Sequence, residues 1–390
     1  MTGQTFSTIE MLTRLVAFDT TSRNSNLALI AFVRDYLAGH GVAVTLIHNE
    51  AKTKANLYAT IGPQDKPGGI VLSGHTDVVP VDGQDWTGDP FTVEARDGRL
   101  FGRGTADMKG FIAAALAHVP QFVAARAETP IHLALSYDEE IGCVGVHGMV
   151  AHIGAHLPRP RLVLVGEPTE MKLVNAHKGI RSFVTQVTGS EAHSSNVHLG
   201  VNAVEVAARL IGFLGELRDE MRVRGDASGR FDPPYTSIHV GVIRGGTALN
   251  IIPRECRFHW EFRALPDQDE EAIIDRFNHF AREVVLPPLR EISAEADIVT
   301  TPQAAVPPLV PLDDCPAEAL VRALTGDNAP LAVAYGTEAG IFQRADIPAV
   351  ICGPGSIDQA HKPDEFIALA ELDACDRFLT KLAAHISTVT

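Results

Sequence analysis

Side chains of the kinds that bind metal ions lie at similar places along the chain, mostly just beyond predicted strands. His75 follows IVLSG, the pair Glu139 and Glu140 follows IHLALSY, Glu167 follows LVLVG, and other candidates are Asp107 in GRGTADMKG and His361 after PAVICG. Loops at the carboxyl ends of strands in an open α/β sheet converge on one crevice. Two histidines, two glutamates and a shared aspartate are about enough ligands for two zinc ions. The combination therefore predicts a two-zinc site, although each residue alone is typical of a hydrogen-bonded turn.

Further carboxylates stand beside these predicted ligands. In the pair Glu139 and Glu140, one glutamate could bind a metal while its neighbour takes a proton from metal-bound water, whose pKa falls to about 7 on zinc. Asp77 lies two residues after His75 and could accept the other ring N–H, which would fix the tautomer that binds metal. Without the histidines, SYDEEIG would indicate a solvated acidic turn, and Asp77 is equally typical of a strand-end cap.

Three other patterns do not predict a site by themselves. His152 and His156 in HIGAH have the i, i+4 spacing of zinc proteases but lack the glutamate that serves as base, which indicates surface residues. GRGTADMKG lacks the full G-x-G-x-x-G pattern of a dinucleotide loop, because position 107 is aspartate. His193 and His198, in EAHSSNVH, cannot be told from histidines of a polar loop on local sequence.

The composition indicates a globular protein and argues against several functions. Hydrophobic residues make up 45% and charged residues 21% of the chain, and the net charge of −15 opposes binding to nucleic acid. The start, MTGQTFSTIEMLTRL, lacks the features of a signal peptide, and no apolar stretch approaches the roughly 18 residues of a membrane span. We therefore expect a soluble cytoplasmic protein without nucleic-acid or membrane partners. The five scattered cysteines predict buried, reduced thiols without a catalytic part.

Helix and strand patterns alternate in the first part of the chain. Ser7 and Glu10 form a capping box before an amphipathic helix, and LALIAFVRDYLAGHG predicts a second helix that ends at glycine. There follow strands VAVTLIHN, NLYATIG and GIVLSG, helix FIAAALAHVPQFVAA, strand IHLALSY, a helix near 144–153 and strand RLVLVG. This alternation is typical of an α/β domain, whose strand ends would position the ligands.

The pattern changes after residue 180. The next segments have the βαββαβ order of a ferredoxin-like unit. They are strand SFVTQVTG, helix VNAVEVAARLIGFLGEL, strands TSIHVGVI and CRFHWEFRA, helix DEEAIIDRFNHFAREV and strand AEADIVT. The proline-rich TPQAAVPPLVPLDDCP then leads back to helix and strand patterns. We predict an α/β catalytic domain of residues 1–180 and 301–390, with a ferredoxin-like α+β domain of residues 181–300 inserted in it.

Five motifs give the chain a family resemblance. The chain contains, in order, the motifs SGHTDVVP, GRGTADMKG, YDEEIGCVG, GEPT and GPGSIDQAHKPDEF. These motifs resemble those of the dinuclear zinc family of aminoacylases, glutamate carboxypeptidases and succinyl-diaminopimelate desuccinylases. The resemblance covers nearly the whole chain. It implies a mixed-sheet hydrolase domain with two Zn²⁺ ions per subunit, or Co²⁺, and an inserted domain that acts as a lid and forms a homodimer.

The resemblance also implies how the metal ligands divide. His75 and Glu167 would bind one zinc ion, Glu140 and His361 would bind the other, and Asp107 would bridge the two.

Three further roles follow from the same resemblance. Glu139 would be the general base that activates water, and Asp77 would orient His75. His193 would reach into the active site of the partner subunit and stabilise the oxyanion that forms when the amide is attacked.

Within the family, NAHKGIRSF, GGTALNIIPREC, YGTEAGIFQ and the final motif look most like the acetylornithine deacetylases. This implies deacetylation of N2-acetyl-L-ornithine in arginine biosynthesis, with Asn250, Arg263 and Thr337 binding the substrate. The planar guanidinium of Arg263 suits a carboxylate. Desuccinylation, acetylcitrulline deacetylation and general aminoacylase or dipeptidase activity share the mechanism, and the motifs do not separate them. A non-catalytic amino-acid-binding protein is a remote alternative, since it would not need Glu139 with every ligand.

Overall fold

The computed structural model describes residues 3–388 and divides the chain into two compact units. Unit 1 is formed by the described parts of Met1–Ala176, Leu309–Ala332 and Thr337–Thr390. Unit 2 is formed by His177–Pro308 together with Val333–Gly336. The chain therefore leaves unit 1 twice, first for the long insertion and then for the four residues Val333–Gly336.

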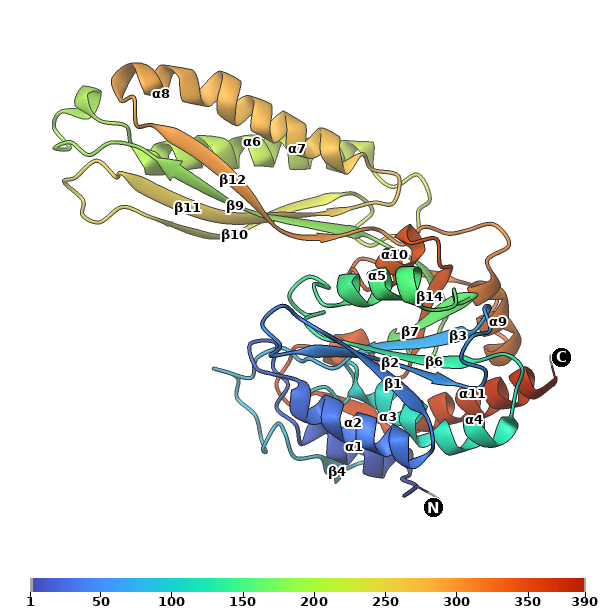
Figure 1. Cartoon of the computed structure of the whole chain (residues 1–390). Coiled ribbons are helices and arrows are strands. Elements are labelled where there is room, and N and C mark those ends of the chain that lie inside the picture. Colours follow the sequence, from blue (N-terminus) through green and yellow to red (C-terminus); the bar gives the residue numbers. More distant parts are fainter. Residues whose placement is uncertain (1–2, 389–390) are drawn as a thin grey trace. The chain divides into compact units, whose positions relative to one another are not determined.

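Unit 1 is built on an eight-stranded mixed sheet (Figure 1). In spatial order its strands are β1 (Ala43–His48), β2 (Ala55–Ile61), β6 (Ile131–Ser136), β3 (Ile70–His75), β7 (Leu162–Pro168), β14 (Ala349–Gly353), β8 (Val174–His177) and β13 (Leu331–Val333). The central strands β6, β3, β7 and β14 run parallel, whereas β1 and β2 pair antiparallel. Strands β2, β3, β6 and β7 are buried along their whole length, as expected for strands covered on both faces.

Helices cover both faces of this sheet (Figure 1). One face carries α1 (Thr8–Val16), α2 (Leu27–Gly39), α3 (Lys109–Ala117), α4 (Val119–Ala125) and α11 (Leu369–Thr388), and the other carries α5 (Val146–His156) and α10 (Ala339–Arg344). Helix α9 (Pro316–Thr325) packs against β7 and β14. The capping box predicted at the start of α1 is confirmed: the Ser7 N–H donates to Glu10 Oε2 at 2.8 Å, and the Glu10 N–H donates to Ser7 Oγ at 3.3 Å.

The prediction of one continuous helix over 111–125 is wrong. The structure has α3 and α4, with His118 between them and Pro120 in the first turn of α4. Proline lacks an N–H, and its ring clashes with the carbonyl of the residue four positions earlier, here Leu116. The hydrophobic spacing continues across the break, so the pattern alone did not reveal it.

A small three-stranded sheet lies beside the main one and was not predicted. It has the order β15 (Phe366–Ala368), β5 (Arg99–Phe101) and β4 (Glu94–Arg96), and all its pairs are antiparallel. Phe366 of β15 pairs with Phe101 of β5. This pairing brings together two loops that are far apart in sequence, the one after β5 and the one before β15.

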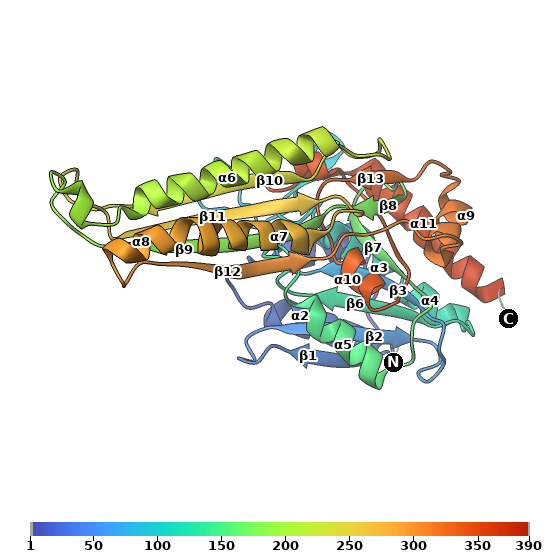
Figure 2. The ribbon, with the colours of Figure 1, turned by 90° about the horizontal axis from the view of Figure 1, so that it is seen from above.

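Unit 2 has the predicted βαββαβ order. Its elements are β9 (Gly179–Thr188), α6 (Ala203–Arg224), β10 (Ser237–Gly245), β11 (Glu255–Ala264), α7 (Glu270–His279), the π-helical Phe280–Val285, α8 (Leu286–Ile292) and β12 (Asp297–Val306). The sheet is antiparallel, in the order β10-β11-β9-β12, and its helices lie on one face (Figure 2). Phe183, Phe258, Trp260 and Phe277 pack in a core of its own. The predicted fold class, an α/β unit with an inserted ferredoxin-like unit, is confirmed.

The last strand of unit 2 is longer than predicted. The pattern AEADIVT ends at Thr300, but β12 continues to Val306 and has an irregular register between Pro302 and Ala304. Because β12 is an edge strand, proline can be accommodated there with a local bulge. Pro302 therefore did not mark the end of the strand, which comes at Val306, just before Pro307.

Two predictions from composition can be compared with the structure. All five cysteines are free and buried, as predicted. Over residues 3–388, none of the helices has both the length and the apolar character needed to cross a membrane.

Candidate metal centre

The carboxyl ends of neighbouring parallel strands bring most of the predicted ligands together. His75 is the last residue of β3, Glu140 lies in the loop after β6, and Glu167 lies near the end of β7. His361 follows β14 and a short 3₁₀ helix at Ile357–Gln359. Strands β6, β3, β7 and β14 are adjacent in the sheet, so the four loops lie next to one another at the carboxyl ends of these strands.

Asp107 lies between the two histidines, and each of its oxygens faces one of them. Its Oδ1 lies 2.9 Å from Nε2 of His75, and its Oδ2 lies 3.4 Å from Nε2 of His361. Each histidine also has a glutamate nearby: Glu167 Oε1 is 3.8 Å from His75 Nε2, and Glu140 Oε2 is 3.0 Å from His361 Nε2. The five side chains thus form two histidine–glutamate pairs on either side of one aspartate.

Glu139 lies in the same group of ligand atoms. Two sets of three residues have ligand atoms that all lie within 4.8 Å of one another: His75 with Glu139 and Glu167, and His75 with Asp107 and Glu140. The thiol of Cys143 donates to Glu139 Oε1 at a distance of 3.1 Å. A cysteine for which no part was predicted thus contacts the predicted base.

The imidazole of His75 is oriented by a backbone carbonyl. Its Nδ1 lies 2.9 Å from the carbonyl oxygen of Asp77, and 3.7 Å from Oδ1 of the same residue. A carbonyl oxygen only accepts hydrogen bonds, so Nδ1 carries a proton and Nε2 points toward Asp107. Asp77 therefore contacts His75 as expected of an orienting residue, but through its backbone instead of its carboxylate.

The carboxylate of Asp77 has other partners. It accepts the backbone N–H groups of Glu139 and Glu140, at 3.1 and 3.3 Å, and the hydroxyl of Ser22 at 2.7 Å. Asp77 is 2% exposed. One buried carboxylate thus fixes the backbone of both glutamates that follow β6, a contact that the sequence alone did not suggest.

Burial raises the pKa values of the glutamates. It raises the pKa of Glu139 to about 8, against the attraction of His75. Burial and repulsion from Asp107 together raise the pKa of Glu140 to about 7, and they hold the pKa of Glu167 well above its usual range. Carboxyl groups crowded in this way need nearby positive charge to stay ionised.

The histidines supply part of that charge. Although burial raises the pKa of Asp107, hydrogen bonds with His361 and His75 outweigh it and lower that pKa below its usual range. Hydrogen bonds with Asp107 and Glu140 raise the pKa of His361 to about 10. The side chain of His361 is 57% exposed, so this end of the group is open to solvent.

These residues fit a metal centre. The group offers only imidazole nitrogens and carboxylate oxygens, the donors that zinc combines in protein sites. The tautomer fixed at His75 leaves Nε2 as its ligand atom, as an outer hydrogen bond does in metal sites. Divalent ions would also supply the positive charge that the buried carboxylates need.

The chain matches a known protein family over most of its length. The model of the peptidase family M20/M25/M40 matches residues 71–385. The chain belongs to this family. It is therefore a metal-dependent hydrolase that acts on amides.

Curated relatives of this M20-family chain match it over almost its full length. An acetylornithine deacetylase from Pasteurella multocida is 34% identical over 393 residues, with 98% of each chain covered. One from Myxococcus xanthus is also 34% identical, with 96% of each chain covered.

Solved structures share the M20 fold at lower identity. An M20-family metallo-carboxypeptidase from Sulfolobus solfataricus has a TM-score of 0.75 and 18% identity, and 98% of this chain and 100% of that one are covered. A dinuclear metal-binding peptidase of the M20 family from Bacillus subtilis has a TM-score of 0.65 and 15% identity, with 98% of each chain covered. These likenesses bear on the fold alone.

Three of the predicted site residues belong to unit 2. His193 is exposed, pairs with Ile251 in an isolated β-bridge, and has Nδ1 2.8 Å from the Ser195 hydroxyl. Asn250 is also exposed. Its carbonyl accepts the N–H of Ser194 at 3.1 Å, so the loop that carries Asn250 contacts the loop that carries His193.

Arg263 lies on β11, at some distance along the unit 2 sheet from the loop that carries His193. Its Nε donates to Glu261 Oε1 at 3.0 Å, and both side chains are about one-third exposed. Unit 2 therefore holds His193 and Asn250 side by side, with Arg263 on a separate element.

Thr337 and its neighbour lie in unit 1. Thr337 is fully buried, and its hydroxyl accepts the N–H of Ala339 at 3.1 Å, at the start of α10. The adjacent Glu338 is 1% exposed and accepts the hydroxyl of Ser73 at 3.2 Å, and burial raises its pKa to about 7. Glu338 was not predicted as a site residue, although it lies in the quoted motif YGTEAGIFQ.

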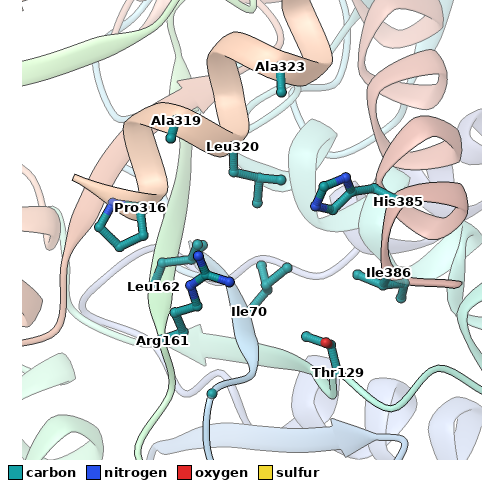
Figure 3. Close-up of a pocket in the computed structure, with 11 residues that line it drawn as sticks. Ile70, Thr129, Arg161, Leu162, Pro316, Ala319, Leu320, Ala323, His385 and Ile386 are labelled. Atoms are coloured by element: carbon teal, nitrogen blue, oxygen red, sulfur yellow. The ribbon is translucent and has the colours of Figure 1, made fainter. Parts of the chain in front are cut away.

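A cavity lies at the amino ends of the parallel strands, opposite the ends that carry the ligands (Figure 3). It is lined by Ile70 and Leu162 at the amino ends of β3 and β7, and by Arg161, Leu320 and His385. The metal-ligand group of this M20-family chain lies at the carboxyl ends of the same strands. The cavity is therefore distinct from the candidate centre.

Proposed function

We propose that this protein removes the acetyl group from N2-acetyl-L-ornithine with the help of two divalent metal ions, zinc or cobalt. The reaction consumes water and gives L-ornithine and acetate. The curated relatives named acetylornithine deacetylase, 34% identical over almost the whole chain, support this substrate. The reaction would take place in the cytoplasm, as a step of arginine biosynthesis.

One observation carries the proposal of a two-metal site: the two oxygens of Asp107 face different histidines. We assign His75 and Glu167 to one ion and His361 and Glu140 to the other, with Asp107 between them. When bound, such ions act as Lewis acids on the substrate carbonyl and lower the pKa of attacking water.

Glu139 is the proposed general base. It lies within 4.8 Å of ligand atoms of His75 and Glu167, yet it is not needed for either histidine–glutamate pair. Its carboxylate would accept a proton from the attacking water and return that proton to the departing amine. Asp77 would support both adjacent roles, since it fixes the backbone of Glu139 and of Glu140.

The remaining proposed residues act on the substrate. His193 would come from the partner subunit of a homodimer formed through the inserted unit, and it would stabilise the oxyanion. Asn250 and Arg263 would bind the substrate carboxylate while unit 2 acts as a lid. Thr337 is fully buried, so it would act through its hydrogen bond to the N–H of Ala339, the first residue of α10.

The test combines metal analysis with kinetics. Purified protein should contain about two zinc ions per chain, and kcat/KM should be highest for N2-acetylornithine among acetylornithine, acetylcitrulline, acetylmethionine and succinyl-diaminopimelate. A clear preference for another member of this panel would reject the substrate and leave the metal centre standing. Binding of amino acids without any hydrolysis would reject catalysis itself.

A further inference from the structure

We propose that Glu365, Arg103 and Gln84 form a clamp that fixes Asp107 relative to His361, and that the clamp sets how tightly the centre binds metal. The proposal rests on the proposed function, because it takes Asp107 and His361 as ligands. The clamp joins residues 102–107, the Asp107 loop, to residues 361–365, the His361 loop. The pairing of β5 with β15 brings these two loops together.

Glu365 holds the Asp107 loop from within. Its side chain is 1% exposed, and each carboxylate oxygen accepts two hydrogen bonds. Oε1 accepts the N–H groups of Ala106 and Asp107 at 2.9 and 3.1 Å, and Oε2 accepts the N–H of Gly104 at 3.0 Å and Arg103 Nη1 at 2.8 Å. The backbone of the proposed bridging ligand is thus bonded directly to Glu365, four residues after His361.

Arg103 extends the contact across to the other loop. Its side chain is 1% exposed, and Nη1 also donates to the carbonyl of Lys362 at 3.2 Å. Nη2 donates to Oε1 of Gln84 at 2.5 Å, and the guanidinium lies 4.9 Å from the ring centroid of Trp86. A planar guanidinium with several fixed partners holds its neighbours in one geometry.

Gln84 completes the clamp at His361 itself. Its Nε2 donates to the carbonyl oxygen of His361 at 2.9 Å, while its Oε1 also accepts the indole N–H of Trp86 at 3.0 Å. His361 has a φ of +64°, in the left-handed region that side chains with a Cβ rarely adopt. Such a conformation persists only where the surroundings enforce it.

The exposure of His361 makes this contact important. Its side chain is 57% exposed, so packing contributes little to its position, and the bond from Gln84 fixes the backbone instead. Asp107 can serve both histidines only while the two loops keep their spacing. Residues that orient metal ligands in this way typically change metal affinity or activity about 10- to 100-fold when replaced.

The test is a zinc titration of metal-free protein in competition with a chromophoric chelator. Glu365→Gln replaces one of the two acceptor oxygens with an N–H₂ group, which cannot accept the loop N–H groups that this oxygen accepts in the wild type. Gln84→Leu removes the donor to His361 at a partly exposed position, where folding is least at risk. Both variants should bind zinc about 10- to 100-fold more weakly, with the weaker binding step most affected.

A matched control separates positioning from general loss of stability. Leu37→Ala makes a cavity in α2, which packs against β1 and β2, so it should lower the melting temperature and leave zinc affinity within about twofold. Zinc affinity within about twofold of wild type in Gln84→Leu, or a loss no larger than that of Leu37→Ala, would overturn the clamp. If Glu365→Gln does not fold, Gln84→Leu decides alone.

Two ligand variants distinguish this failure from failure of the metal centre. Asp107→Asn and His361→Ala should each abolish binding of at least one ion. If they do so while Gln84→Leu has no effect, the clamp is wrong and the centre stands. If they leave both binding steps unchanged, the proposed centre is wrong, and the clamp with it.

Discussion

The carboxylate of Asp77 accepts the backbone N–H of Glu139 at 3.1 Å, although the two residues are 62 positions apart. The other oxygen of Asp77 accepts the N–H of Glu140 at 3.3 Å, and its backbone carbonyl lies 2.9 Å from Nδ1 of His75. One residue therefore touches two proposed ligands and the proposed base. Its effect on catalysis should exceed that of a residue that orients a single imidazole.

Asp77→Asn should lower kcat by about 10- to 100-fold and change KM less. The amide keeps the size of the side chain, but its N–H₂ group cannot accept a backbone N–H, so one of the two glutamates loses its partner. Steady-state kinetics with zinc in excess measure this effect. Ser22→Ala, which removes only the hydroxyl donor to Asp77, should have a smaller effect. Equal effects of the two changes would contradict this account.

Glu139→Gln should lower kcat by about 10²- to 10⁴-fold while both metal ions stay bound. The amide cannot take up the proton from water, but none of the four histidine–carboxylate contacts among the proposed ligands involves Glu139. Kinetics and elemental analysis on the same sample provide the two measurements. Glu167→Gln is the matched comparison, because it should lose metal as well as activity. Substantial activity in Glu139→Gln would remove Glu139 as the base.

Cys143 contacts the same carboxylate, so a change there should be visible but smaller. Cys143→Ala removes the S–H donor to Glu139 Oε1 and should lower kcat by less than Glu139→Gln does. Cys143→Ser restores a donor and should recover most of the activity. Kinetics of the two variants side by side measure the difference. The contact has no part in catalysis if both variants match wild type.

Removal of metal should destabilise the protein. Ions that bind only the folded state stabilise it by RT ln(1 + [L]/Kd), or about 2.7 kcal/mol when free zinc is 100 times Kd. A chelator should therefore lower the melting temperature, and added zinc should restore both the melting temperature and activity. Differential scanning calorimetry at several free zinc concentrations measures the shift. A melting temperature independent of zinc would contradict a centre built from these residues.

The strand-end part of the site could be predicted because it depends on local patterns. Short apolar runs mark β3, β6 and β7, and the chain places His75, Glu140 and Glu167 at or beyond their ends. Parallel strands align those ends whatever the rest of the fold does. The same local reasoning predicted the βαββαβ order of unit 2.

The support around the site could not be predicted, because it depends on pairings distant in sequence. Arg103 and Glu365 are separated by 262 positions, and the strands that bring their loops together, β5 and β15, have three residues each. Such strands are too short to show a period of two. The carboxylate of Asp77 was expected to contact His75, but it accepts hydrogen bonds from the loop after β6 and from the hydroxyl of Ser22.

A buried histidine away from the site provides a test of the fold itself. His132 on β6 is 2% exposed, stacks on Tyr58 with ring centroids 5.2 Å apart, and has Nδ1 3.0 Å from the hydroxyl of Thr60. Among the residues that the structure describes, its Nε2 has no hydrogen-bond partner. Burial lowers the pKa of His132 to about 4.

This shift predicts a loss of stability in mild acid. Because the pKa of His132 is lower in the folded state than the value of about 6.5 in the unfolded chain, the unfolded state binds the proton first as pH falls. The contribution of His132 to the free energy of unfolding is therefore complete above about pH 6.5 and is lost as pH falls toward 4, at a cost of about 2 kcal/mol by pH 5.

His132→Phe cannot bind a proton, so its free energy of unfolding should fall less than that of wild type between pH 7.5 and 5. Urea denaturation of metal-free protein at both pH values measures this difference, and the exposed substitution His156→Phe should keep the wild-type dependence. Equal pH dependence in wild type and His132→Phe would mean that His132 is not held neutral in the folded state.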